Sequence, residues 1–424
     1  MSVWKEYKIS ELGKVVTGKT PSSKNPEEWG TLVAFVTPTD FDSYNKSIEG
    51  SIRYLSERGA NVFNSKLLPP NSVIVTCIGS QMGKVALNKI PCVTNQQINS
   101  IILNENFNSD FIYYLISSMQ DYLRNLATGG STMPIVNKSD FENIKIIAPN
   151  LTTQTAIAEI LSSLDDKIEL NIKINQELES LAQTLFKQWF IDFEFPNEKG
   201  DPYKSSGGEM LENELGEIPK GWATEVLSEA TKLIRGISYR KPELVSKGEG
   251  IAFVNLKCFS LNGTFRQDGI KYYNGKYKNE QILSENDILV AVTDLTQGRE
   301  IIGMPILWNG SSTALPSLDT CIIRSESIEL KNYLYYEFKT KRYKSRIIEH
   351  ANGSTVLHLS VKGLETYVFP LPNESLLKSW SAIIQPILEK INSNINEIIE
   401  LSKTRDALLP KLITGELEIN EIKN

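Results

Sequence analysis

The sequence predicts an α+β protein in which one unit is used twice, giving a pseudo-two-fold internal repeat. Three observations predict this fold class. Short segments recur at offsets of about 215 to 223 residues along the 424-residue chain. Each copy opens with β-type runs between polar loops, and each closes with a helix whose apolar residues follow heptad spacing. We therefore expect two similar mixed α/β domains separated by an antiparallel two-helix coiled coil.

Composition limits the class of protein. Hydrophobic residues make up 41% and charged residues 23%, which is typical of a globular chain of two or three domains. The net charge of −6 provides no global attraction for nucleic acid. Four isolated cysteines and two histidines argue against a disulfide framework and a histidine-based metal site. The N-terminus lacks an apolar signal core and no run of about 18 apolar residues occurs, so we expect a cytoplasmic protein without a membrane segment.

The repeat is clearest where Trp4 and Trp222 open similar segments. Phe35 and Phe253 share their offset, and a Gly-Ser-Thr triplet returns 223 residues later. A stretch rich in Pro, Gly, Lys and Glu lies between the copies and indicates a linker. The predicted boundaries are 1–150 for the first domain, 151–195 for a first helical spacer, 196–221 for the linker, 222–372 for the second domain and 373–424 for a second helical spacer.

Each domain is expected to contain short strands followed by helix. Apolar β-type runs bounded by Gly, Asn and Pro predict the strands. Segments with helical spacing of apolar residues come after them. The expected strands are at 72–78, 100–103, 287–293 and 320–324, and the expected helices are at 111–126 and 332–348.

The two heptad helices carry the coiled-coil prediction. A single amphipathic stripe is more often an ordinary core helix, but this one occurs twice, each time after a similar domain. A short return path between the helices makes the pair antiparallel. About 25 residues of such a helix extend roughly 38 Å, close to one turn of B-DNA at about 34–36 Å, so we interpret the pair as a ruler. The predicted seam consists of Leu161, Leu164, Ile168, Asn171, Asn175, Leu178, Ala182 and Leu185 in the first helix and Leu388, Ile391, Ile395, Ile398 and Leu401 in the second.

Residues 13–20 match the GxxxxGK[ST] pattern of nucleotide-binding phosphate loops. That loop works between a buried strand and a helix whose N-terminus faces the phosphates. Here Pro21 and Pro26 follow at once, and the second copy keeps only Gly236. We interpret the match as chance, with nucleotide binding as a minor alternative.

Polar loops are the better candidates for function. Their sequences differ between the copies while the framework persists, as expected if one scaffold presents two different reading surfaces. Thr, Ser, Asn, Gln, Lys and Arg bond base edges and phosphates in DNA complexes, although a polar loop can equally be solvated without a function. The candidate DNA-binding residues are Thr17, Lys19, Thr20, Ser22, Lys24, Thr37, Thr39, Asp40, Ser80, Gln81, Lys84, Asn95, Gln96, Gly130, Ser131 and Thr132 in the first copy, and Arg235, Tyr239, Arg240, Lys241, Asn255, Lys257, Thr293, Gln297, Arg299, Gly353, Ser354 and Thr355 in the second.

Basic residues are dense at 339–346, beside Tyr335, Tyr336 and Tyr343. This cluster is interpreted either as an edge that contacts phosphates or as a solvated helix face. The sequence contains no nucleophile–histidine pair, no adenine-methylating signature and no AdoMet-type glycine loop. We therefore expect no catalytic residue and no metal ligand in this chain.

Several motifs resemble the specificity (S) subunits of type I restriction-modification systems. They are ELGKVVTGKTPS at 11–22, the two Gly-Ser-Thr triplets, PNLTTQ at 149–154, FKQWFIDF at 186–193, ELGEIPKGW before the second domain and LPKLITGE near the C-terminus. The resemblance covers nearly the whole chain and implies two target-recognition domains that each read half of a split DNA sequence. It implies helices that set the spacer and dock two methyltransferase (M) subunits, which carry AdoMet, and restriction (R) subunits, which consume ATP with Mg²⁺. The S subunit itself would hold no cofactor and perform no chemistry.

Two departures from the family pattern are visible. The position of Gln154 falls on Leu377 in the second copy, and the acidic balance suggests that this chain alone binds DNA poorly. A coiled-coil scaffold without a DNA role is the competing interpretation. The sequence does not identify the bases read, the spacer length or the contacts of individual loop residues.

Overall fold

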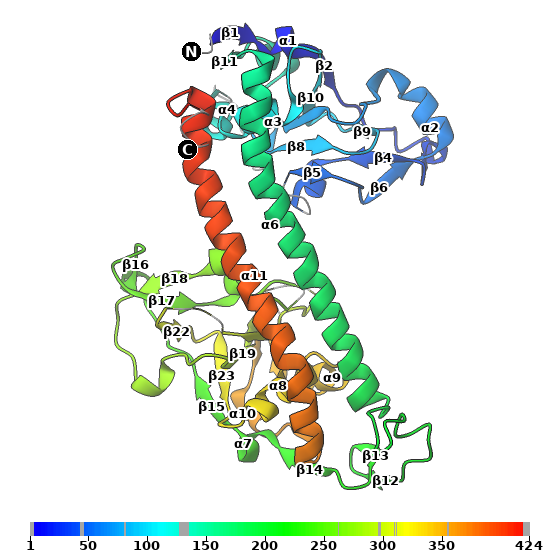
Figure 1. Ribbon diagram of the computed structural model, residues 1–424, viewed down its shortest axis with the longest axis vertical. Coiled ribbons are helices and arrows are strands. Elements are labelled where there is room, and N and C mark those ends of the chain that lie inside the picture. The colour runs from blue at the N-terminus through cyan, green and yellow to red at the C-terminus, as the bar shows by residue number, and fades with distance from the viewer. Residues whose placement is uncertain are drawn as a thin grey trace. The chain divides into compact units, whose positions relative to one another are not determined.

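The computed structural model describes the chain except residues 1–3, 43–45, 80–81, 127–134, 262, 296–297, 309, 311, 354–355 and 419–424. The chain folds as two compact units, residues 1–172 with 395–424, and residues 173–394. Each long helix contributes one part to each unit, so the helices do not form units of their own. These helices are α6 (Leu151–Phe186) and α11 (Glu374–Thr414) (Figure 1).

Among the described residues of the first unit, β1 and β11 form a two-stranded sheet, and two larger sheets share a core. A five-stranded sheet has the order β2-β10-β7-β8-β5, and a four-stranded sheet has the order β3-β6-β4-β9. The strands are β1 (Lys5–Lys8), β2 (Gly13–Thr17), β3 (Trp29–Gly30), β4 (Val33–Val36), β5 (Ser47–Ile48), β6 (Arg53–Leu55), β7 (Val73–Thr76), β8 (Val85–Asn88), β9 (Cys92–Thr94), β10 (Ile98–Leu103) and β11 (Lys145–Ala148). The helices are α1 (Ile9–Leu12), α2 (Glu57–Val62), α3 (Ser109–Ser117), α4 (Gln120–Leu126) and α5 (Lys138–Glu142).

The second unit repeats this plan. Its sheets have the orders β15-β23-β19-β21 and β16-β18-β17-β22, and a three-stranded sheet, β20-β25-β24, is added. The strands are β12 (Met210–Asn213), β13 (Gly216–Pro219), β14 (Ala223–Val226), β15 (Lys232–Arg235), β16 (Leu244–Val245), β17 (Ile251–Val254), β18 (Lys271–Tyr273), β19 (Ile288–Ala291), β20 (Thr293–Asp294), β21 (Pro305–Leu307), β22 (Ala314–Pro316), β23 (Thr320–Arg324), β24 (Ala351–Asn352), β25 (Leu357–Leu359) and β26 (Val368–Leu371). The helices are α7 (Leu227–Ala230), α8 (Ile328–Glu337), α9 (Lys341–Glu349) and α10 (Val361–Glu365).

The central strands are apolar without alternation because both of their faces are buried. In β7, Val73 and Val75 pack in the cluster that contains α3 and the start of α6, whereas Ile74 packs in the cluster with β4 and β9. The equivalent strand β19 divides in the same way, with Ile288 and Val290 on one face and Leu289 on the other. The predicted strands at 72–78, 100–103, 287–293 and 320–324 are therefore confirmed in place, with shorter bounds at 73–76 and 288–291.

Each expected helix after the strands is two helices. Residues 111–126 divide into α3 and α4, and residues 332–348 divide into α8 and α9. In the second case the Thr340 hydroxyl accepts the N–H of Tyr343 at 3.1 Å, which caps a new N-terminus where the sequence pattern shows no break.

The segment expected to be a linker is folded into the second unit. Strands β12 and β13 form a hairpin. The Phe195 ring stacks on Tyr203 at 4.6 Å between centroids and on Trp222 at 5.8 Å. These rings belong to the main core of that unit, so residues 196–221 contribute packing as well as connection.

Helices α6 and α11 pack antiparallel in each unit. In the first unit, Arg405 pairs with Asp165 at 2.7 Å, and Asn171 Nδ2 donates to Glu397 Oε2 at 2.9 Å. In the second unit, Asn394 Nδ2 donates to Asn175 Oδ1 at 2.8 Å. Residue numbers rise along α6 as those of their partners in α11 fall, so the helices are antiparallel, as the coiled-coil prediction requires. Of the leucines and isoleucines of the predicted seam, Leu161, Ile168 and Leu388 are buried, and Leu164, Leu178, Leu185, Ile391, Ile395, Ile398 and Leu401 are half-buried.

The seam contains buried asparagines at equivalent places in the two copies, Asn171, which the sequence pattern includes, and Asn394. Asn171 is 1% exposed and Asn394, 223 residues later, is 0% exposed. The sequence pattern assigned the neighbouring Ile395 to the seam and missed Asn394. A buried Asn in a coiled coil fixes the alignment of the helices at a cost in stability.

Replacing one asparagine of the Asn175–Asn394 pair should lower the free energy of unfolding more than replacing both. Asn394→Leu leaves the half-buried Asn175 Oδ1 without its donor, so we expect a loss of about 1 kcal/mol in the free energy of unfolding. Because Asn394 Oδ1 has no partner among the described residues, the double variant Asn175→Leu/Asn394→Leu should regain most of that loss. Urea unfolding measures both, with Asn396→Leu on the exposed face of α11 as the control. A double variant less stable than the single one would contradict this account.

Candidate nucleic-acid interface

In the first unit three of the predicted polar loops, at 17–24, 37–40 and 95–97, meet with the end of β7 at one edge of the two sheets. The backbone between them provides the contacts: Gly18 N–H donates to Ile98 O at 3.2 Å and Lys19 N–H to Thr94 O at 2.9 Å. These bonds join the end of β2 to the loop between β9 and β10. Two further hydrogen bonds hold the same loop. Asn95 N–H donates to Val36 O at the end of β4, at 3.0 Å, and Cys77 N–H, after the end of β7, donates to Gln97 O at 2.8 Å.

Gly18 is required for this crossing. A Cβ atom at Gly18 would lie 2.2 Å from the backbone oxygens of both Thr94 and Asn95. The residues before it form strand β2, and the described residues directly after it form no α-helix. The interpretation of the phosphate-loop match as chance is consistent with this geometry, since the glycine serves a close backbone approach and no α-helix follows it directly among the described residues.

Side chains along this edge bond to one another across loops. Thr17 Oγ1 donates to Asn99 Oδ1 at 2.6 Å, and Thr20 Oγ1 donates to Gln96 Oε1 at 2.6 Å. Asn95 is 8% exposed and its amide bonds the backbone and side chain of Gln97. The candidates that present exposed side chains here are Lys19, Ser22, Lys24, Thr39 and Gln96, while Lys84 and Thr37 are half-buried.

The buried Asp40 carboxylate accepts hydrogen bonds from two loops of this edge. The carboxylate is 2% exposed and accepts the backbone N–H of Thr37 at 2.7 Å and the hydroxyl of Thr37 at 2.8 Å. The other oxygen accepts the Ser51 hydroxyl at 3.0 Å and the Ile52 N–H at 2.9 Å. Asp40 therefore positions two loops and has no free oxygen for a base.

The second unit builds the same edge from different residues. Gly236 N–H donates to Thr320 O at 3.1 Å and Ile237 N–H to Pro316 O at 2.9 Å, at the end of β15. Ser317 N–H donates to Val254 O at 2.7 Å, at the end of β17. A Cβ at Gly236 would lie 1.8 Å from Ser317 O, so this glycine has the role of Gly18.

One loop of this second edge was missed in the sequence. Residues 317–319 occupy the place of residues 95–97, because Val292 N–H donates to Asp319 O at 2.8 Å as Cys77 donates to Gln97. The strand offset of 222 residues between β10 and β23 would have located it. Leu318 in this loop is 45% exposed.

The candidates of the second copy divide by burial. Asn255 is 4% exposed and bonds Gly269 O at 2.8 Å, and Thr293 is 5% exposed within β20, so both side chains support the fold. Asp294 accepts the N–H groups of Ile301 and Ile302, both at 2.8 Å, and so fixes the loop that carries Arg299. The exposed candidates are Arg235, Arg240, Lys241, Lys257, Arg299 and Gly353, and Tyr239 is half-buried.

Some candidates lie outside the described residues. They are Ser80, Gln81, Gly130, Ser131, Thr132, Gln297, Ser354 and Thr355.

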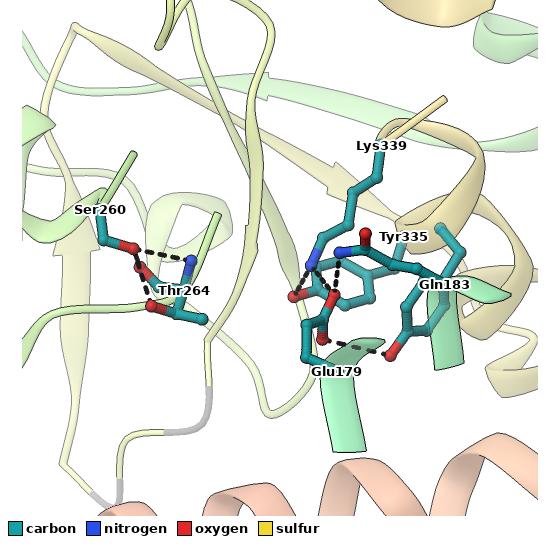
Figure 2. Close-up of polar contacts among 7 residues, drawn as sticks. Glu179, Gln183, Ser260, Thr264, Tyr335 and Lys339 are labelled. Atoms are coloured by element: carbon teal, nitrogen blue, oxygen red, sulfur yellow. Dashed lines mark hydrogen bonds and ion pairs between the residues drawn. The ribbon is translucent and has the colours of Figure 1, made fainter. Parts of the chain in front are cut away.

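The basic cluster at 339–346 is largely internal. Lys339 Nζ pairs with Glu179 at 2.6 Å and donates to the Tyr335 hydroxyl at 2.7 Å, as Figure 2 shows. Arg342 pairs at 2.6 Å with Glu337, which is 0% exposed. Burial lowers the pKa of Lys339, against the opposing effect of Glu179. The interpretation of this cluster as a solvated or phosphate-contacting surface is therefore wrong for Lys339 and Arg342, whereas Lys341 and Arg346 are exposed.

The two long helices begin with equivalent caps. Asn150 Oδ1 accepts the N–H of Thr153 at 3.0 Å, and Asn373 Oδ1 accepts the N–H of Leu376 at 2.9 Å. Gln154 is buried and bonds Asn108 N–H and Pro149 O, both at 2.9 Å. Leu377 takes its place in the second copy by joining the core, so the departure noted in the sequence leaves the cap intact.

The cysteines of the first unit are buried. Burial raises the pKa of Cys77 to about 11 and of Cys92 to about 12, so both remain thiols at neutral pH. Among the described residues, no three His, Cys, Asp or Glu side chains are placed to hold a metal ion. Over the same residues, no helix has the length and apolar character that crossing a membrane demands.

Comparisons with known proteins agree on one family. The family described as "Type I restriction modification DNA specificity domain" matches residues 1–180. The chain is 31% identical to the type I restriction enzyme MjaIX specificity subunit of Methanocaldococcus jannaschii, over 99% of this chain and 94% of that protein. It is 22% identical to the HindI specificity subunit of Haemophilus influenzae, over 98% of this chain and 100% of that protein. The solved S subunit from M. genitalium shares the fold, with a TM-score of 0.61 at 16% identity over 97% of this chain and 96% of that one.

Proposed function

Since the chain belongs to the family of type I restriction enzyme specificity subunits, we propose that each of its two repeated domains reads one half of a bipartite DNA target. The observation that carries this proposal is the repeated edge. In both copies the ends of equivalent strands bring the same four loops together. The loops meet where a glycine, Gly18 or Gly236, passes close to the backbone of a neighbouring loop, and their side chains differ between the copies. A frame that is repeated in the two copies and carries two different sets of loops suits the reading of two different half-sites.

The paired helices are proposed to set the spacer between the half-sites. They are continuous over 36 and 41 residues, and buried Asn171 and Asn394 fix their alignment. We further propose that the helices dock two methyltransferase subunits, and that restriction subunits join that assembly. AdoMet, ATP and Mg²⁺ would then belong to those partners, which would carry out adenine methylation and DNA cleavage, and this chain would supply specificity alone.

The competing functions gain no support from the geometry. A phosphate loop at 13–20 lacks the helix N-terminus that its chemistry needs. A scaffold without a DNA role does not require two matched sets of convergent polar loops.

The proposal is tested by measuring DNA affinity with and without the methyltransferase partner. Because the chain carries a net charge of −6, we expect it alone to bind in the range of non-specific binding, a Kd of about 10⁻⁴–10⁻⁶ M at physiological salt. The assembled complex should reach about 10⁻⁸ M or tighter on its target. Equal affinity of the complex for target and scrambled DNA would contradict the proposed function. Tight specific binding by the chain alone would contradict only the division of contacts between subunits.

A further inference from the structure

In each unit a cationic side chain lies over an aromatic ring that itself packs edge to face on a phenylalanine. The Arg53 guanidinium lies 3.5 Å from the centroid of Trp29 and 5.8 Å from that of Phe35. The two rings meet edge to face, at 4.9 Å and 89°. Stacking on an aromatic face holds the guanidinium plane in one orientation while its N–H groups remain free to bond.

Arg53 is adjacent to a loop of the first edge. It pairs directly with Phe35, one residue before the end of β4, and the next residue after β4 is Thr37. The carboxylate of Asp40, which holds Thr37, also holds Ile52. Arg53 and the predicted loop at 37–40 are thus fixed to each other by one buried carboxylate.

The surface around Arg53 is accessible. Ile52 is 72% exposed and lies beside the exposed Arg53. Trp29, Ile52, Arg53 and Tyr54 line a hollow of about 430 Å³. Within the described part of the chain, no carboxylate forms an ion pair with Arg53, in contrast to Arg58, which pairs with Glu27 at 3.2 Å.

The second unit places a cation in the same position. Lys271 pairs directly with Phe253, the equivalent of Phe35, and its Nζ lies 5.8 Å from the centroid of Tyr239. Tyr239 meets Phe253 edge to face at 5.1 Å and 85°. Trp29 belongs to β3 whereas Tyr239 follows β15, so the two aromatic supports come from different parts of the repeat. The arrangement and its phenylalanine are shared, although the cation and the second aromatic residue differ.

We propose that Arg53 and Lys271 are DNA-contacting residues, one for each half-site. This inference rests on the proposed function and names residues that the polar-loop pattern did not include. Arg53, planar and pre-oriented by Trp29, donates two hydrogen bonds to a guanine in the major groove, with Ile52 against a neighbouring base. Lys271, a point charge without a fork of donors, contacts a phosphate of the other half-site.

The test uses the chain assembled with its methyltransferase partner and measures methylation rates on a library that varies every target position. For Arg53→Ala we expect discrimination at one G·C pair of one half-site to fall by about 5- to 150-fold, with the other half and the spacer unchanged. Arg53→Lys should keep binding but not that discrimination. Lys271→Ala should leave the motif unchanged and reduce the salt slope of binding by about one. Arg58→Ala, an exposed arginine of the same unit, is the matched control.

The outcomes distinguish a failure of the Arg53 assignment from a failure of the proposed function. A wild-type complex that methylates a bipartite motif, with Arg53→Ala and Arg53→Lys both retaining full discrimination, overturns the assignment of Arg53 and leaves the proposed function standing. A wild-type complex without any bipartite motif overturns the proposed function itself. Equal thermal unfolding of the variants and the wild type shows that any loss of discrimination comes from the missing contact.

Discussion

A paired insertion of seven residues in the two long helices is expected to lengthen the DNA spacer by about three base pairs and to leave both half-sites unchanged. The inserts are placed after Leu178 in α6 and after Lys390 in α11. Asn175 donates to Ile391 O at 3.3 Å, so these two points lie at the same level of the seam in the second unit. Seven residues add roughly 10 Å of helix and keep the heptad phase. At about 3.4 Å per base pair that length corresponds to three base pairs.

The control for this prediction is an insert that does not lie in a helix. Seven Gly and Ser residues after Gly207 enlarge an exposed turn, where a Cβ would meet no atom within 4 Å. That variant should keep the wild-type spacer. If the paired helical insertion changes the bases of a half-site and keeps the spacer, the assignment of the helices as the spacer is wrong.

The second large effect is expected from Asp40→Asn. Each carboxylate oxygen of Asp40 accepts two hydrogen bonds, so an amide of the same shape turns an N–H₂ group toward two donors. We expect the free energy of unfolding to fall by on the order of 3 kcal/mol, because the group is buried and charged. The loops at 37–40 and 51–53 should lose their fixed positions, so specificity should relax in one half of the target only.

Asp121→Asn is the matched control, since the Asp121 side chain is 93% exposed. This substitution removes the same charge but leaves no buried donor without a partner. Urea unfolding and the methylated motif are measured on both variants. Full stability together with an unrelaxed motif in Asp40→Asn would show that Asp40 does not position these loops.

The repeat, the helices and the position of the loops could be predicted because they leave local patterns. Trp4 and Trp222 start equivalent segments, and the heptad spacing from Leu161 to Leu185 needs no knowledge of the partner helix. Gly18 is part of the match to a nucleotide-binding motif, but in the fold it lets the backbone pass close to the backbone oxygens of residues 94 and 95. That crossing exists only once β9 and β10 are in place.

What the sequence could not show depends on partners distant in the chain. The basic residues Lys339 and Arg342 look solvated until Glu179 and Glu337 are placed beside them. Strands of two to four residues, such as β3 and β16, have too little periodicity to be recognised. Arg53 lies outside any polar loop, and only strand pairing with Phe35 places it next to the edge.

The central claim is that two repeated domains of one chain read two different half-sites. It is tested most directly by sequencing N6-methyladenine in DNA from cells that express this chain with its methyltransferase partner, and from cells that express the partner alone. We expect a bipartite motif with methyladenine in both halves, absent when this chain is omitted. A contiguous motif, or methylation that persists unchanged without this chain, would contradict the claim.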